Sequence, residues 1–255
     1  MTDPISVKEH PLLLSAPMVL AALAGRKNVT RRILSKRNTL IDGKPWSQSK
    51  CSPYDRGRHT QWEDLDFNIF KIHPDGLHVA CKHAYAAHHH ILTPIYQPGD
   101  VVWFKETFCE PINHGDLRNE SIRAKVNGVE YAADMGIERF PLGGNFTPQL
   151  RDFRWRSSMF MPRWACRLVR PVTNSHIERV QDITEEQAER EGVARFSTKG
   201  TSAEQTFVAT KFPDGYRTNF MLLWNLLRPK TGQHWDDNPI VVAIEFGDKE
   251  CDHND

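Results

Sequence analysis

The sequence predicts an α+β fold built round a mostly antiparallel β-sheet or small barrel. Short β-rich segments are mixed with a few helical ones, without the regular βαβ order of a parallel sheet. The 255 residues, 39% hydrophobic and 25% charged, have the composition of a globular protein. We therefore expect one domain over residues 1–246, followed by a flexible polar tail over 247–255.

A capping box predicts one helix with defined ends. The Thr184 side chain is placed to cap the first turn and Gln187 to return the bond, while Ile183 and Ala188 make a hydrophobic staple. The helix is expected to end at Glu191.

Two further helices are expected from other signals. The first has Pro17 in its first turn, where the missing N–H costs nothing, and ends at Gly25, which tolerates a left-handed conformation. The second is predicted by apolar residues at i, i+3, i+4 and i+7, which are Phe220, Leu223, Trp224 and Leu227.

Strands are expected over residues 101–108, 164–172 and 240–246. In the first of these, alternation places Val102, Phe104, Glu106 and Phe108 on one face. If that face is buried, the Glu106 carboxylate must be paired or protonated. We expect its partner to be Lys27, Arg31 or Arg163, and the site to be either a structural ion pair or a pocket carboxylate.

Three regions look like insertions. Residues 38–97 mix Trp, Pro, Ser, His and Arg without sustained periodicity, and residues 110–160 and 195–215 are rich in turn-forming residues. We expect these regions to be largely irregular.

Charge and cysteine usage limit the function classes. A net charge of +1, from 33 basic and 32 acidic residues, gives no overall attraction to polyanions, so any nucleic-acid contact must be local. Five cysteines without a C-x-x-C pair indicate a reducing, cytoplasmic compartment. The apolar run over 12–24 is too short to span a bilayer and is interrupted by Pro17, so no membrane association is expected.

No cofactor or metal is expected. The sequence has no P-loop, dinucleotide-binding, G-x-S-x-G or H-E-x-x-H motif. A group of cysteines and histidines suggests zinc, but its spacing matches no established ligand pattern and a His-rich loop explains it equally well. The residues of this group are Cys51, Cys81, His83, His88, His89 and His90.

A basic segment is the first candidate site. Six cations lie within twelve residues: Arg26, Lys27, Arg31, Arg32, Lys36 and Arg37. A lysine beside other cations loses proton affinity, so Lys27 is a candidate base that activates the Thr30 hydroxyl. The alternative is a solvated basic turn at the negative end of a helix.

Glu191 is the second candidate. At the last turn of its helix the negative charge opposes the macrodipole, and Arg190 beside it softens the penalty. A carboxylate in such a place is a candidate general acid. The alternative is an ordinary exposed glutamate at a helix end.

A stretch of cations interleaved with aromatic residues suits phosphates and unpaired, stacked bases. The same pattern arises when strand arginines face solvent and the aromatic residues face the core. The stretch comprises Arg151, Phe153, Arg154, Trp155, Arg156, Phe160, Arg163, Trp164, Arg167 and Arg170.

Three segments resemble a known family. Gly25-x-Lys27-x-x-Thr30-x-Arg32 after a short helix resembles the motif of the ASCH domain, a PUA-like β-barrel associated with RNA that usually has Glu at the Thr30 position. With Thr it is similar to small bacterial N(4)-acetylcytidine amidohydrolases, whose segment ending in a catalytic Glu resembles 183–191. Their closing strand is similar to 242–246. The longer layout, with Gly99–Thr107 and Met161–Ala165, resembles uncharacterised ASCH-like proteins of phages and prophages.

This resemblance implies a PUA-like fold and an amidohydrolase with Lys27 as base, Thr30 as nucleophile and Glu191 as general acid. We further expect base stacking on Trp103, Trp164 or Phe104, and oxygens or phosphates held by Arg31, Arg32 and Arg163, with Glu106 also near the substrate. No obligate protein partner is evident.

Two other functions stay open. One is a non-catalytic module that binds RNA or a modified base, since PUA-like domains often bind without catalysing a reaction. The other is a metal-independent ribonuclease in which Lys27 is the base and Glu106 or Glu191 is the acid.

Overall fold

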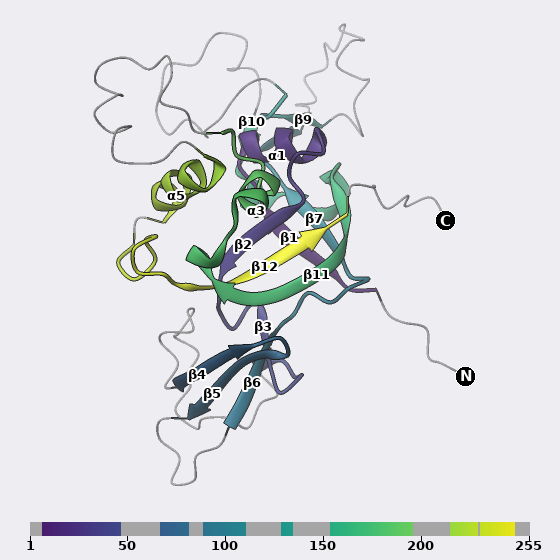
Figure 1. Cartoon of the computed structure of the whole chain (residues 1–255). Helices are drawn as coiled ribbons and strands as arrows, with labels where there is room; N and C mark the ends of the chain where they lie inside the picture. The colour runs from purple at the N-terminus through teal and green to yellow at the C-terminus, as the bar shows by residue number, and fades with distance from the viewer. Residues whose placement is uncertain are drawn as a thin grey trace, which may run out of the picture. The chain divides into compact units, whose positions relative to one another are not determined.

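The computed structural model describes residues 7–46, 67–81, 89–110, 129–134, 154–195, 215–228 and 230–247. The chain forms two compact units, and Figure 1 labels their helices and strands. The first unit consists of Met1–Lys27, Gly99–Pro171 and Gly247–Asp255. The second consists of Asn28–Pro98 and Val172–Phe246.

The expected mixture of mainly strands with a few helices is confirmed, but the sheets are not closed into a barrel. The largest sheet has the strand order β1-β7-β11-β12-β2, and two smaller sheets have the orders β10-β8-β9 and β3-β6-β5-β4. β1 and β2 are therefore the two edges of an open sheet. This sheet is also mixed, because β1 runs parallel to β7 while its other pairs are antiparallel.

The first unit contains the expected N-terminal helix. This helix, α1 (Ala16–Leu23), has a proline in its first turn and is followed by Gly25 at φ 70°, as its end signals predict. The strands of this unit are β1 (Glu9–Leu13), β7 (Val101–Lys105), β8 (Phe108–Glu110), β9 (Glu130–Tyr131) and β10 (Arg154–Arg156). Two short 3₁₀ turns are η5 (Ser158–Phe160) and η6 (Arg163–Ala165).

The strand expected over 101–108 is interrupted. β7 ends at Lys105 and β8 begins at Phe108, yet the alternating side chains of the predicted face are all buried. The face was therefore predicted correctly although the element was not. The buried residues are Val102, Phe104, Glu106 and Phe108.

The strand expected over 164–172 is wrong at both ends. Arg163–Ala165 forms η6, and β11 runs over Val169–Arg179. β11 pairs with β7 through 169–171 and with β12 (Ile240–Phe246) through 172–179, with a register shift between Val172 and Asn174. A bulge at a change of partner lets one long strand continue, which the sequence pattern did not reveal.

The second unit is organised round an apolar cluster under two helices. α3 (Glu185–Arg190) and α5 (Tyr216–Leu227) pack on each other, and their apolar faces meet side chains from β2 (Val29–Ile33) and β12. Both helices were predicted, although Leu227 is exposed instead of buried. The cluster consists of Val180, Ile183, Ala188, Val193, Phe220, Trp224, Trp235 and Val241. A 3₁₀ turn, η7 (Val180–Asp182), leads into α3.

The region 38–97 contains a four-stranded sheet where we expected irregular structure. Its strands are β3 (Thr39–Ile41), β4 (Phe67–His73), β5 (Gly76–Cys81) and β6 (His89–Pro94). Buried Leu77 and Val79 alternate with His78, a pattern that the mixed composition of this region concealed. Gly76 has φ 142°, and a Cβ there would lie 2.4 Å from the Leu92 carbonyl oxygen, so glycine is required.

Several sequence predictions fall outside the described residues. These are the tail from residue 248, the loop over 196–214 and most of the insertion over 110–160.

Candidate functional site

β2 positions the basic segment at the edge of the large sheet. Its pairing with β12 is regular, with Thr30 opposite Ile244 and Arg31 opposite Ala243. Because side chains alternate along a strand, Thr30 and Arg32 share one face and Arg31 lies on the other. Both Thr30 and Arg31 are buried.

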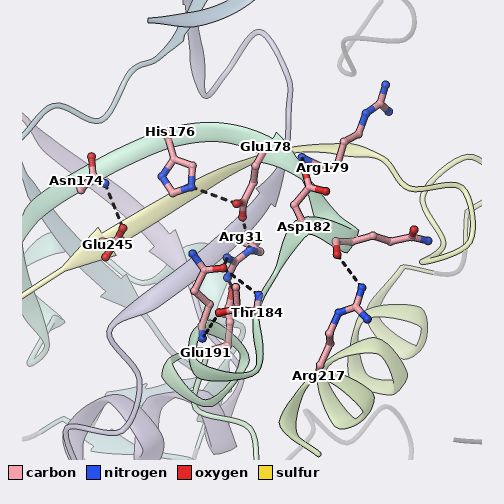
Figure 2. A network of polar contacts seen from close by, with 12 residues as sticks. Arg31, Asn174, His176, Glu178, Arg179, Asp182, Thr184, Glu191, Arg217 and Glu245 are labelled. Carbon is pink, nitrogen blue, oxygen red and sulfur yellow. Dashed lines mark hydrogen bonds and ion pairs between the residues drawn. The ribbon is translucent and has the colours of Figure 1, made fainter. Parts of the chain in front are cut away.

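Arg31 is the centre of a buried cluster (Figure 2). Its Nε donates to Glu178 Oε1 at 2.6 Å, Nη1 to Glu191 Oε1 at 3.2 Å and Nη2 to Gln187 Oε1 at 3.1 Å. The Arg31 side chain is only 1% exposed, so these bonds form away from bulk solvent. We call these four residues, from β2, β11 and α3, the Arg31 cluster.

The sequence placed Glu191 correctly at the end of α3. The capping box is present, with the Thr184 hydroxyl accepting from the Gln187 N–H and the Gln187 side chain accepting from the Thr184 N–H, each at 3.1 Å. Glu191 is the C-cap residue and Gly192 follows with φ 83°. Glu191 is 5% exposed, so the alternative of an ordinary exposed glutamate is wrong.

Glu191 lies beside the free edge of β2. The Asn28 N–H donates to the Arg190 carbonyl at 3.0 Å, which joins the start of β2 to the end of α3. From this edge, Glu191 contacts Arg31 and also acts electrostatically on Arg32, whose side chain leaves the strand on the opposite face. Arg190 does not serve Glu191 as expected, because it bonds Asn28 and Glu245 at 2.8 Å each.

Glu178 and His176 were not identified from the sequence. His176 Nε2 lies 3.2 Å from Glu178 Oε2, and half-exposed His176 connects the Arg31 cluster to the surface. Burial alone would raise the pKa of Glu178, but the His176 contact and the Arg31 charge together lower it. Both residues lie in the part of β11 beyond the expected strand, so its alternation pattern did not point to them.

The three expected catalytic residues are all buried. Lys27 is 3% exposed and follows the turn after α1, where its N–H donates to the Ala21 carbonyl at 3.1 Å. Thr30 and Glu191 belong to the second compact unit, whereas Lys27 is the last residue of a segment of the first. The reading of residues 26–32 as a solvated turn is therefore wrong for Lys27, Thr30 and Arg31, while Arg26 is exposed.

Glu106 has a different partner from those expected. Arg167, and neither Lys27, Arg31 nor Arg163, binds it with two hydrogen bonds of 2.9 and 3.0 Å. Arg167 Nη1 also donates to both oxygens of Asp134 at 2.8–2.9 Å. Burial raises the pKa of Glu106, and the Arg167 bonds offset this only in part. We call Glu106, Asp134 and Arg167 the Arg167 cluster.

The expected base-stacking residues differ in access. Phe104 is fully buried, while Trp103 is half-buried between the Lys105 amine at 5.5 Å and the Arg163 guanidinium at 5.8 Å from the ring centre. Trp164 is 53% exposed and Phe160 70% exposed. Glu9 accepts two hydrogen bonds of 2.8 and 3.1 Å from Arg163. Arg167 is bound by Glu106 and Asp134, as described above. Several arginines of the basic–aromatic stretch are thus engaged within the chain.

Three members of the histidine-rich group, Cys51, His83 and His88, lie outside the described residues. Within them, His90 Nδ1 contacts Asp42 Oδ2 at 2.6 Å, which lowers the pKa of Asp42 against the effect of burial. The described part of the chain contains no group of three or more potential metal ligands. None of its helices is long and apolar enough to cross a membrane.

Comparison with known proteins finds no family model, curated protein or solved structure that matches this chain.

Proposed function

We propose that this chain is a PUA-like amidohydrolase that removes an acyl group from the exocyclic amine of a cytosine-type base or nucleoside. One observation supports this above others. In the second unit, the parts of the three segments that resemble the amidohydrolases are adjacent, because β2 pairs with β12 and the preceding Asn28 N–H donates to the Arg190 carbonyl at the end of α3. The absence of a C-x-x-C pair favours a cytoplasmic location.

The proposed reaction assigns one step to each buried group. Lys27 accepts the Thr30 hydroxyl proton as the Thr30 oxygen attacks the acyl carbonyl. The carbon–nitrogen bond breaks, and the proton taken from Thr30 passes from Lys27 through Glu191, the general acid, to the departing amine. Water then hydrolyses the acyl–Thr30 ester, so one amide and one water give a carboxylic acid and a free amine.

The position of Glu191 suits this role. It is supported by the electrostatic effect of Glu191 on Arg32, which shares the Thr30 face of β2, while Arg31 holds the same carboxylate from the other face. Arg31 acts here as a positioning residue, because its bond restricts the rotation of Glu191.

The test is release of acetate and cytidine from N(4)-acetylcytidine by the full chain. We expect Lys27→Ala, Thr30→Val and Glu191→Gln each to lower turnover by about a hundredfold or more, as for loss of acid–base or nucleophilic groups. Arg26→Ala and Glu186→Gln, which change exposed neighbours, are matched controls and are expected to retain wild-type turnover. Wild-type turnover by Lys27→Ala would exclude this mechanism.

A second candidate is a module that binds RNA or a modified base without turnover. The exposed rings of Phe160 and Trp164 favour it, because accessible aromatic rings stack on unpaired bases. It predicts RNA binding that weakens about tenfold when Trp164 is replaced by alanine, together with no product from any acylated nucleoside.

A further inference from the structure

Glu178 shares the Arg31 guanidinium with Glu191, the proposed general acid (Figure 2). Arg31 Nε donates to Glu178 Oε1 at 2.6 Å, whereas Nη1 donates to Glu191 Oε1 at 3.2 Å. The third acceptor, Gln187 at 3.1 Å from Nη2, is neutral. One positive charge thus serves two carboxyl groups, and the shorter bond is made to Glu178.

The register of the large sheet places Glu178 within reach of Arg31. Arg31 lies opposite Ala243 on β12, and Ala243 lies opposite His176 on β11. Residues opposite each other share a face, so Glu178, two residues after His176, lies on the face of Arg31. Because the β12 residue in this row is alanine, its methyl group leaves the space above β12 to the Arg31 and Glu178 side chains.

Both Arg31 and Glu178 have further contacts that hold them in place. The Arg31 guanidinium carbon lies 6.0 Å from the centre of the Phe220 ring on α5. His176 Nε2 lies 3.2 Å from the second Glu178 oxygen, Oε2. Burial alone would raise the pKa of Glu178, but its contacts with His176 and Arg31 lower it. Glu178 is therefore ionised at neutral pH and keeps its bond to Arg31.

Charged groups on two strands act on Glu191. From β2, Arg31 bonds to it and Arg32 interacts with it electrostatically. From β11, Glu178 opposes this attraction, because it holds the Arg31 guanidinium at shorter range and repels a negative charge on Glu191. A carboxyl group beside a like charge, with a shared cation, keeps a proton more readily than one with the cation to itself.

We propose that Glu178 is a positioning residue for Glu191, acting through Arg31 and supported by His176. Arg31 orients the Glu191 carboxyl group, and Glu178 prevents the same guanidinium from holding Glu191 in its ionised form. A general acid needs both properties, since it must be oriented and must carry a proton when the leaving group departs. This role rests on the proposed function.

The first test follows the titration of Glu191 in the full chain through its side-chain carboxyl resonance in NMR spectra, assigned with Glu191→Gln. Glu178→Gln leaves Arg31 to Glu191 alone, so we expect Glu191 to titrate about one pH unit lower than in the wild type. Glu245→Gln is the matched control, because Glu245 lies on the same face and accepts from Arg190 at 2.8 Å, outside the Arg31 cluster. It should leave the titration unchanged. No shift in Glu178→Gln, or an equal shift in Glu245→Gln, overturns the proposal.

A milder variant keeps the test decisive if Glu178→Gln does not fold. Glu178→Asp keeps the charge and withdraws it from Arg31 by one methylene group. We expect Glu191 to titrate lower than in the wild type, by less than in Glu178→Gln. If Glu178→Asp is the folded variant and its Glu191 titrates as in the wild type, the proposal is overturned.

Turnover of N(4)-acetylcytidine separates this role from a purely structural one. In Glu178→Gln, the alkaline limb of the kcat profile should move about one pH unit lower, with KM unchanged, because Glu178 acts through Arg31 and not on the substrate. Glu245→Gln should keep the wild-type profile. A rise in KM without movement of the limb would contradict the positioning role.

The outcome is separable from that of the hydrolase proposal. A lower titration of Glu191 in Glu178→Gln, without acetate release by the wild type, supports the control of Glu191 by Glu178 and excludes the hydrolase. Acetate release by the wild type, with the same Glu191 titration in Glu178→Gln, supports the hydrolase and overturns the role of Glu178.

Discussion

The two compact units each contain one arginine shared between two carboxylates, yet the two clusters differ in how they are held. In the Arg31 cluster, the guanidinium is 1% exposed and bonds Glu178, Glu191 and Gln187. In the Arg167 cluster, the guanidinium is 16% exposed and makes two hydrogen bonds to Glu106 and two to Asp134. Its face also lies 3.9 Å from the Tyr131 ring centre.

One carboxylate in each cluster has a shifted pKa, and the two shifts have opposite directions. The pKa of Glu178 is lowered because contacts with His176 and Arg31 outweigh its burial. The pKa of Glu106 is raised because its burial outweighs the bonds from Arg167, while Asp134 adds a like charge. An arginine partner therefore does not fix the direction of the shift; the balance between desolvation and the number of stabilising contacts does.

The largest expected difference between the clusters is the effect of removing the arginine. Arg31→Met leaves buried Glu191 and partly buried Glu178 without their cation, so we expect a loss of about 3–5 kcal/mol in the free energy of unfolding. Arg167→Met should cost less, about 1–3 kcal/mol, because solvent reaches Asp134 and the arginine itself. Urea unfolding of both variants at neutral pH measures the difference.

A charge-retaining variant provides the control for this prediction. Arg31→Lys keeps the positive charge and loses the three-way geometry, so its loss should lie between those of the wild type and Arg31→Met. A greater loss in Arg167→Met than in Arg31→Met would contradict the ranking.

The sequence predicted elements whose signals are local. The Thr184–Gln187 capping box and the position of Glu191 are as expected, because each depends on a few neighbouring residues. The bulge in β11, the break after Lys105 and the short strands of 38–97 were missed, because sheet partners decide where such strands begin and end. Barrel closure likewise depends on strand order, which composition and periodicity do not contain.

The candidate site was predictable only in part, for the same reason. Lys27, Thr30 and Glu191 were recognisable from motifs, and all three are buried. Their partners were not, since Glu178 is 147 residues from Arg31 along the chain and Arg167 is 61 residues from Glu106. Such contacts arise from the pairing of β11 with β12 and from the packing of α3, which a single sequence does not reveal.

The opposite pKa shifts predict opposite dependences of stability on pH. Glu178 has a folded-state pKa below the usual 4.5, so its stabilisation is present above that pH and is lost as pH falls. Glu106 has a raised pKa, so its contribution is full below 4.5 and is lost as pH rises through its folded value. On acidification from neutral pH to about pH 3, Glu106→Gln should therefore lose more stability than the wild type above pH 4.5, and Glu178→Gln should lose less below it.

Urea midpoints across this pH range test the prediction. Each variant is compared with its own value at neutral pH, so the constant cost of the substitution cancels. Parallel pH profiles for the two variants would show that the clusters do not differ in the way described.

The smallest expected difference concerns the two side-chain caps. Thr184 starts a full helical turn and its hydroxyl accepts at 3.1 Å, so Thr184→Ala should cost about 1 kcal/mol. Ser157 caps a three-residue 3₁₀ turn, and its hydroxyl accepts from Met159 at 3.4 Å, so Ser157→Ala should stay within about 0.5 kcal/mol of the wild type. Urea unfolding at neutral pH distinguishes the two. An equal loss in both variants would mean that the capping box adds nothing to α3, and that Gln187 is held instead by its bond from Arg31.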